Sequence, residues 1–109
     1  MKKFFCLHGL PRAGNTLLGS LLNQNSKIAV TANSPCADMI GELYMLKHTD
    51  IFKNFPDHKS FDNVTKSLFQ NYYKDWSADY IIDRAPWGLP INLKFLKKVQ
   101  DEIKIIVLV

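Results

Sequence analysis

Short apolar runs alternate along this chain with longer stretches in which apolar residues recur every three or four positions. The runs cover about residues 3–8, 28–32, 79–83 and 103–109 and predict strands. The helical spacing predicts helices over about residues 15–23, 34–47, 60–76 and 88–99, with residues 49–59 as a loop. Strands that alternate with helices are typical of a parallel sheet with right-handed crossovers. We therefore expect an α/β fold with about four parallel strands and flanking helices.

The same spacing predicts which side chains of the helical stretches face the core. They are Leu17, Leu18, Leu21 and Leu22; Met39, Ile40, Leu43 and Leu46; Phe61, Val64, Leu68, Phe69, Tyr72, Tyr73 and Trp76; and Leu89, Leu93 and Leu96. We also expect a buried Cys6 thiol, caps at Ser34 and Ser60, and a helix start at Pro90. The last run is apolar except for Lys104, which is typical of a strand covered on both faces.

Composition narrows the class of protein. The chain has 109 residues, enough for one small core, and its 47% hydrophobic content indicates a globular protein. A net charge of +4 suits an anionic ligand without demanding nucleic acid, and two cysteines are too few for a disulfide scaffold. No apolar run approaches the ~20 residues of a membrane span. We expect a cytoplasmic protein that binds neither nucleic acid nor membrane, and the scattered histidines predict no metal site.

The segment HGLPRAGNT, residues 8–16, joins the first predicted strand to the first predicted helix. Gly9 and Gly14 allow the backbone amides between them to turn inward, toward the free N–H groups at the helix start. Arg12 adds a planar cation that matches phosphate oxygens, and Thr16 adds a hydroxyl donor. This combination predicts a phosphate-binding loop; the alternative is an ordinary strand–helix turn.

The segment differs from the loop of nucleotide triphosphatases at one position. Gly9, Gly14 and Thr16 match the G-x-x-x-x-G-K-[ST] pattern, but Asn15 stands where that pattern has lysine. The lysine bridges the outer phosphates of a triphosphate, so its absence argues against hydrolysis of ATP or GTP. The cation lies inside the loop instead, at Arg12.

Two stretches resemble a known family. GLPRAGNTLL, residues 9–18, resembles the 5′-phosphosulfate loop of the sulfotransferases, which typically reads G-x-P-R-S-G-[ST]-[ST]-L; the match is closest to the tyrosylprotein and related bacterial branch. YIIDRAPW, residues 80–87, is similar to the family's strand that ends in D-K-x-P-[WF]. The resemblance implies a P-loop-like nucleotide-binding fold, of which residues 1–109 form the N-terminal part of a single domain.

The resemblance also implies a donor and a set of site residues. The donor is 3′-phosphoadenosine 5′-phosphosulfate, used without a metal and held by Pro11, Arg12, Ala13, Gly14, Asn15 and Thr16. Arg12 and Arg84 are the expected catalytic residues, with Arg84 standing where the family has a lysine near the bridging oxygen. An ion pair with Asp83 is the alternative role for Arg84. The family's residues for the 3′-phosphate are expected beyond Val109, so we expect a fragment of a longer enzyme.

The acceptor side of the reaction is less defined. The tyrosylprotein branch has a Glu shortly after the second strand, but residues 30–34 hold no carboxylate. Asp38 and Glu42 follow one or two helical turns later and either face the site or lie on a solvated helix face. We expect transfer of a sulfuryl group to a hydroxyl or amine of an unidentified acceptor. A nucleotide or nucleoside kinase and a truncated, non-catalytic phosphate-binding module are the alternatives; oligomeric state is not predicted.

Overall fold

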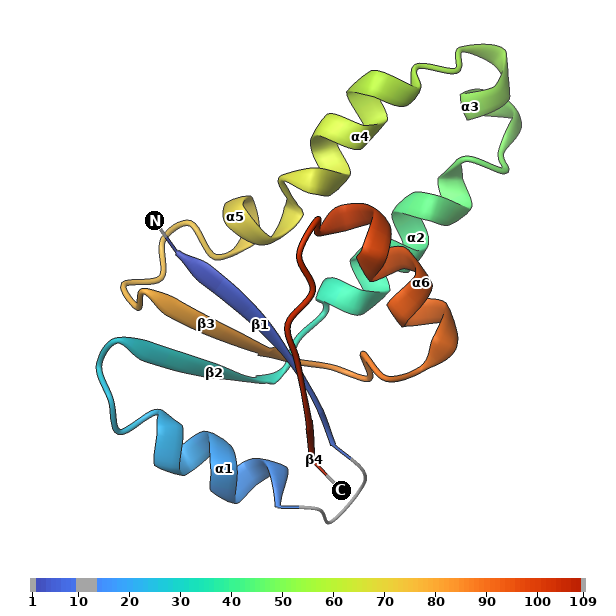
Figure 1. Cartoon of the computed structure of the whole chain (residues 1–109). Helices are drawn as coiled ribbons and strands as arrows, with labels where there is room; N and C mark the ends of the chain where they lie inside the picture. The colour runs from blue at the N-terminus through green and yellow to red at the C-terminus, as the bar shows by residue number, and fades with distance from the viewer. Residues whose placement is uncertain (1, 10–13, 109) are drawn as a thin grey trace.

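A computed structural model describes residues 2–9 and 14–108 of the chain and has an α/β architecture built on a four-stranded parallel sheet (Figure 1). The strands are β1 (Lys3–Gly9), β2 (Ile28–Asn33), β3 (Tyr80–Arg84) and β4 (Ile105–Leu108), in the order β2-β3-β1-β4. Each neighbouring pair is parallel. The predicted class, a parallel sheet of about four strands with flanking helices, is confirmed.

The strand order places β1 and β3 side by side in the centre of the sheet. The chain passes from β1 to the edge strand β2, returns to β3, and then crosses β1 to reach β4. The register between β1 and β3 pairs Cys6 with Asp83 and Leu7 with Arg84. Because all strands are parallel, the segments that follow β1 and β3 leave from the same edge of the sheet. Ligands of open α/β sheets bind at this carboxyl edge, where successive connections diverge.

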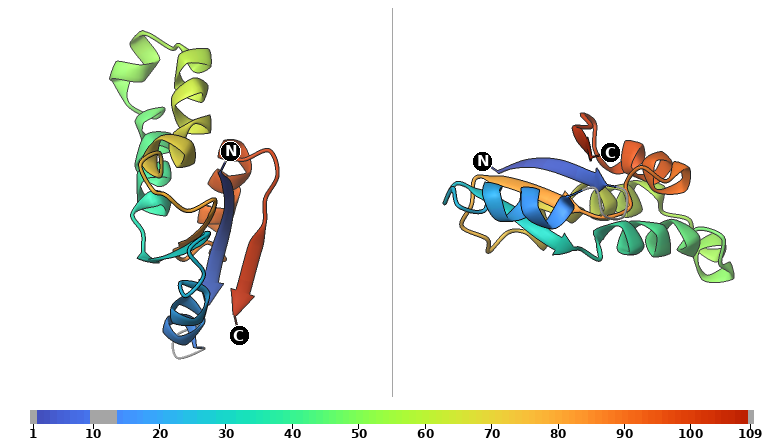
Figure 2. Two further views of the ribbon diagram at one scale, coloured as in Figure 1. Left: turned by 90° about the vertical axis from the view of Figure 1, so that its left-hand side faces the viewer. Right: turned by 90° about the horizontal axis from the view of Figure 1, so that it is seen from below.

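Helices cover the two faces of the sheet unequally. They are α1 (Asn15–Leu22), α2 (Cys36–Leu46), α3 (Asp50–Asn54), α4 (His58–Lys66), α5 (Leu68–Tyr72) and α6 (Pro90–Val99). Side chains of α2, α4, α5 and α6 pack on one face, and those of α1 on the other. Helices α2 and α4 project away from the sheet and carry α3 at their far end (Figure 2). Within the described ranges, the helices are all too short or too polar to cross a membrane.

Alternation along the strands sends side chains into two apolar clusters. The larger cluster joins Cys6 and Ile81 of the sheet to the buried side chains of the four helices, with Phe69, Tyr73 and Trp87 at its centre. The smaller cluster forms under α1. Its buried members are Leu7, Val30 and Ile82. The sheet is therefore a true middle layer, as a parallel sheet requires.

The predicted loop over residues 49–59 is wrong, because it contains α3 and the start of α4. The Thr49 hydroxyl caps α3 by accepting from the Phe52 amide, and the Asp57 carboxylate caps α4 by accepting from the Ser60 amide at 3.0 Å. Ser60 is thus the donor to a cap rather than the cap itself. Polar residues typical of loops are also those that begin helices, and here they begin two short ones.

The predicted single helix over residues 60–76 is also wrong. It ends at Lys66 and restarts after Ser67 as α5. The buried positions recur every fourth residue, at Phe61, Thr65, Phe69 and Tyr73, so the expected core positions Phe61, Phe69 and Tyr73 are confirmed. Three other members of the expected stripe are exposed, namely Val64, Tyr72 and Trp76.

Helix α1 uses a narrower apolar face than its four leucines predict. Leu18 and Leu22 pack on the sheet, and between them Gly19 lies so close that an added Cβ would sit 3.5 Å from the Val30 side chain. Leu17 and Leu21 are exposed, at 66% and 56% of their surface. Leu46 and Leu89, expected in the core, are exposed as well. The close approach at Gly19 sets which side of the helix faces the sheet.

The last strand is shorter and less buried than the sequence predicts. It begins at Ile105 and lies at the sheet edge, paired with β1 alone. Val107 leaves 58% of its surface exposed, so β4 is only partly covered. A continuous apolar run is typical of a covered strand, but it does not by itself supply the covering element.

The orientation of α1 predicts opposite results for two neighbouring leucines. Leu18→Ala removes contacts in the smaller cluster and should lower the free energy of unfolding by about 1–3 kcal/mol. The matched change Leu17→Ala alters an exposed side chain and should stay within about 0.5 kcal/mol of the parent protein. Urea unfolding followed by circular dichroism measures both, and equal costs would contradict this orientation.

Candidate anion-binding site at the carboxyl edge of the sheet

The glycine-bounded segment is described at both of its ends. Gly9 closes β1, and Gly14 is the N-cap of α1 with φ of 95°, in the left-handed region that disfavours any side chain. The cap carries no side-chain hydrogen bond, and the first turn of α1 holds no acidic residue. The N-cap residue therefore offers these amides no side-chain acceptor, and the helix dipole adds positive potential there.

Asn15 is the residue that replaces the lysine of triphosphatases, and it lies inside the fold. Its side chain is buried and packs on the backbone of Gly9, where an added Cβ would sit 1.8 Å from Asn15 Oδ1. Gly9 is thus required for this packing, and the Asn15 side chain braces the start of α1 against the end of β1. Thr16, next along the helix, is exposed.

The structure describes three of the six residues predicted to hold the donor. Gly14, Asn15 and Thr16 form the start of α1, at the edge that the sequence predicts. Pro11, Arg12 and Ala13 lie outside the described residues. Their roles, and those of the other residues predicted to hold the donor, stay predictions.

The second loop begins at a buried carboxylate, Asp83. It is fully buried at the end of β3 and accepts hydrogen bonds from three side chains. The Ser34 hydroxyl donates at 2.7 Å and Trp87 Nε1 at 2.9 Å, and the Tyr73 hydroxyl donates to Oδ2. Trp87 Nε1 also donates to the main-chain carbonyl of Asp83. A buried carboxylate needs such donors, because its lost hydration is costly.

These bonds join parts of the chain that are distant in sequence. Ser34 lies between β2 and α2, Tyr73 follows α5, and Trp87 lies in the turn after β3. Sequence reasoning missed Tyr73 as a polar partner because it counted the residue in an aromatic stripe, and it assigned Ser34 only as a cap. The N-cap of α2 is Pro35 rather than Ser34, although the Ser34 oxygen accepts from the amide of Cys36, the first residue of the helix, at 3.2 Å.

Arg84 is positioned through its backbone. Its amide donates to Thr31 Oγ1 at 2.9 Å, and its carbonyl accepts from the Ser34 amide at 2.8 Å. The expected alternative, an ion pair with Asp83, is not formed: in the described ranges the recorded ion pair is Lys104 with Glu102. Arg84 is half-buried, and its guanidinium makes no hydrogen bond to another described residue.

The two cysteines carry no reactive thiolate. Cys6 and Cys36 are buried and free. Burial, and then the neighbouring Asp83 carboxylate, raises the pKa of Cys36 to about 12 and raises the pKa of Cys6 further. The thiolate is the nucleophilic form of cysteine, so both side chains act as core residues at neutral pH. The prediction of a buried Cys6 thiol is confirmed.

His8 lies at the junction of the two loops, which the sequence pattern does not indicate. It is half-buried, one residue before Gly9, and its ring packs on Gly88 in the turn after β3. Its Nδ1 is buried and has no hydrogen-bond partner in the described part of the chain. Asp38 and Glu42, the two carboxylates considered for the acceptor side, are both exposed on α2.

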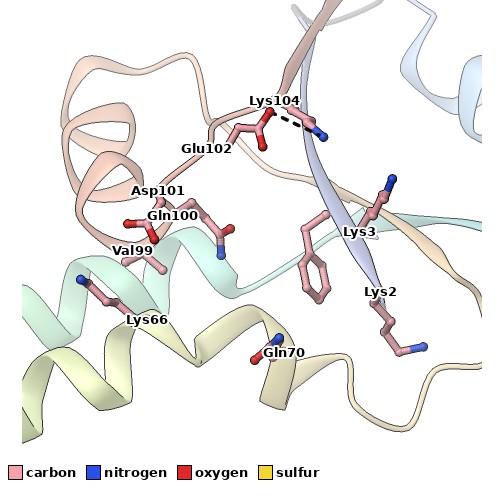
Figure 3. Close-up of a pocket in the computed structure, with 10 residues that line it drawn as sticks. Lys2, Lys3, Lys66, Gln70, Val99, Gln100, Asp101, Glu102 and Lys104 are labelled. Carbon is pink, nitrogen blue, oxygen red and sulfur yellow. Dashed lines mark ion pairs between the residues drawn. The ribbon is translucent and has the colours of Figure 1, made fainter.

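A separate pocket of about 380 Å³ lies at the opposite, amino edge of the sheet (Figure 3). Its lysines are partly engaged: Lys104 pairs with Glu102 at 3.8 Å, and Lys2 donates to the carbonyls of Trp76 and Ala78. This pocket is far along the strands from the glycine-bounded segment and does not belong to the same site.

Comparisons with known proteins add no assignment. No protein-family model matches this chain, and neither a curated protein nor a solved structure matches it. In residues 2–9 and 14–108, no group of three or more His, Cys, Asp or Glu side chains is arranged to hold a metal ion. Function must therefore be argued from the residues and their geometry.

The hydrogen bonds to Asp83 predict a specific stability loss. Tyr73→Phe removes one donor while keeping the ring, which leaves the buried carboxylate underbonded and should cost about 1–3 kcal/mol of unfolding free energy. Tyr72→Phe is the matched control, because Tyr72 is exposed and adjacent. Urea unfolding at pH 7 should separate the two variants, and a neutral Tyr73→Phe would show that the hydroxyl does not support Asp83.

The raised thiol pKa values predict that the folded state becomes less stable at alkaline pH. The unfolded chain loses its thiol protons near pH 8.5, but the folded chain retains that of Cys36 to about pH 12. The folded state therefore binds more protons in this window, and stability falls as pH rises above about 8.5, by up to roughly 1.4 kcal/mol per pH unit for each thiol. Cys36→Ala should flatten the decline measured by urea unfolding between pH 7 and 10; an unchanged slope would contradict the assignment.

Proposed function

We propose that this chain carries the donor-binding part of a sulfotransferase that uses 3′-phosphoadenosine 5′-phosphosulfate on a P-loop-like fold. The observation that carries the proposal is the direct pairing of β1 with β3, which sets Leu7 opposite Arg84. This register brings the cation of the second motif-like stretch beside the end of β1, where the glycine-bounded segment starts. Two sequence stretches about 70 residues apart thereby contribute to one edge.

The start of α1 fits the 5′-phosphate of such a donor. Its N-cap residue offers no side-chain cap, Thr16 is exposed, and the left-handed Gly14 lets the backbone turn toward a ligand. Arg12 would supply the charge that these neutral donors lack. The same group leaves in the reaction, so these donors stabilise charge that increases as its bond to sulfur breaks.

Arg84 would act at the bridging oxygen between phosphate and sulfur. Its backbone is held at Thr31 and Ser34, and its guanidinium is not committed to Asp83. An arginine neutralises developing charge but does not donate a proton at neutral pH. Its proposed role is therefore electrostatic, which suits a phosphate leaving group that needs no protonation.

The transfer itself follows the logic of an in-line group transfer. An acceptor hydroxyl or amine forms a bond to sulfur while the sulfur–oxygen bond to the 5′-phosphate breaks, and the acceptor loses its proton. The chain's residues position the donor and stabilise the leaving phosphate. Asp38 and Glu42 are exposed and point to no specific acceptor, so the class of acceptor stays open within this proposal.

Calorimetric titration tests the proposal. We expect adenosine 3′,5′-bisphosphate, the product form of the donor, to bind with an affinity that EDTA does not change. Arg12→Ala and Arg84→Ala should each weaken binding by about tenfold or more, because each removes a charge-assisted hydrogen bond. Lys66→Ala, at the opposite edge of the sheet, is the matched control and should have no effect.

Other outcomes of this titration would overturn the proposal. Binding of ATP that requires magnesium, with no binding of the bisphosphate, would favour a kinase. The buried position of Asn15 argues against that result, since no lysine reaches the outer phosphates from this position. Binding of the bisphosphate, with no sulfuryl transfer from 3′-phosphoadenosine 5′-phosphosulfate to any acceptor in a separate activity assay, would favour a non-catalytic phosphate-binding module. Binding of neither nucleotide would reject all three.

A further inference from the structure

His8 directly precedes the glycine-bounded segment, packs on the turn after β3, and has no role in the proposal above. It lies in β1 directly before Gly9, and its backbone pairs with Val107 of β4. Its neighbour Leu7 pairs with Arg84. The side chain is therefore held by the sheet at the point where the two loops leave it.

The contact with Gly88 fixes the orientation of the ring. A Cβ added at Gly88 would sit 2.5 Å from His8 Cδ2 and 2.8 Å from Nε2, so the Cδ2 edge of the imidazole lies against this glycine. Nδ1 is on the other edge of the ring and faces away from the turn. Any side chain at position 88 would displace the ring, so the turn has a glycine where the histidine needs space.

The fixed ring leaves Nδ1 buried without a hydrogen-bond partner from the described part of the chain. A buried polar atom with no partner costs stability, and native proteins keep few of them. Such atoms concentrate at functional sites, where a ligand supplies the missing partner. Asp83, the neighbouring buried polar group, differs in having three side-chain donors.

We propose that His8 is a further ligand-binding residue of this edge, whose Nδ1–H donates a hydrogen bond to the anionic ligand bound between the two loops. This inference rests on the proposed function, because it takes the phosphosulfate end of the donor as that anion. Imidazole is a suitable donor here, because either ring nitrogen can carry the proton. The role is binding, and no proton transfer is assigned to His8.

A residue kept for a ligand at the expense of stability should give opposite signs in two measurements. His8→Leu fills the same space and removes the buried nitrogen that lacks a partner. Its unfolding midpoint in urea should therefore equal or exceed that of the parent protein. Its affinity for adenosine 3′,5′-bisphosphate should fall by about tenfold or more. If the role of His8 were purely structural, His8→Leu would instead lower the unfolding midpoint in urea.

Two further variants sharpen the test. His8→Asn restores a nitrogen donor close to the position of Nδ1 and should recover most of the affinity lost in His8→Leu. His48→Leu is the matched control, because His48 is exposed after α2, away from this edge. It should change neither affinity nor stability.

Nitrogen-detected NMR of the three imidazole rings provides a direct readout. Titration with the bisphosphate should shift the Nδ1 signal of His8 and leave the signals of His48 and His58 in place. Equal binding by His8→Leu, or an unmoved His8 signal in a protein that binds the bisphosphate, would overturn this inference and leave the proposed function intact. If the parent protein binds no bisphosphate, the proposed function fails and this inference with it.

Discussion

The burial of the Asp83 carboxylate is the constraint on which the candidate site depends. A carboxylate at the end of a central strand must find donors, and it finds them on Ser34, Tyr73 and Trp87. These donors come from the β2–α2 connection, the end of α5 and the turn after β3. Satisfying one buried group therefore fixes three segments at the carboxyl edge. It also gives Asp83 neutral donors, and among the described residues the Arg84 guanidinium forms no ion pair with it.

The carboxyl edge of the sheet holds both a fully hydrogen-bonded buried group and a buried nitrogen without a hydrogen bond to any described residue. Asp83 is surrounded by donors, whereas His8 Nδ1 is buried with no partner in the described ranges. Glycines allow both arrangements: Gly9 accommodates the Asn15 side chain, Gly88 accommodates the His8 ring, and Gly14 adopts the left-handed cap. We interpret Asp83 as the support of the site and the His8 nitrogen as one of its ligand-facing groups.

The sequence predicts the alternation of strands and helices and the shared edge of the two motif-like stretches, because periodicity and parallel connections determine both. It does not predict the phase of α4 and α5, since aromatic residues such as Tyr72 and Trp76 satisfy helical spacing on either face. Nor does it reveal the donors of Asp83 or the His8–Gly88 contact, which depend on residues up to 80 positions apart. Those contacts follow from the strand order, and only the folded chain brings them together.

The central claim is that both loops bind one anion together, and amide NMR tests it most directly. Titration of the labelled protein with adenosine 3′,5′-bisphosphate should shift the amides of residues 14–16 and of residues 84, 85, 87 and 88 along a single binding curve. Amides beside Lys3 and Lys104 at the opposite edge should stay in place. Shifts confined to one loop, or centred on the opposite edge, would contradict the account.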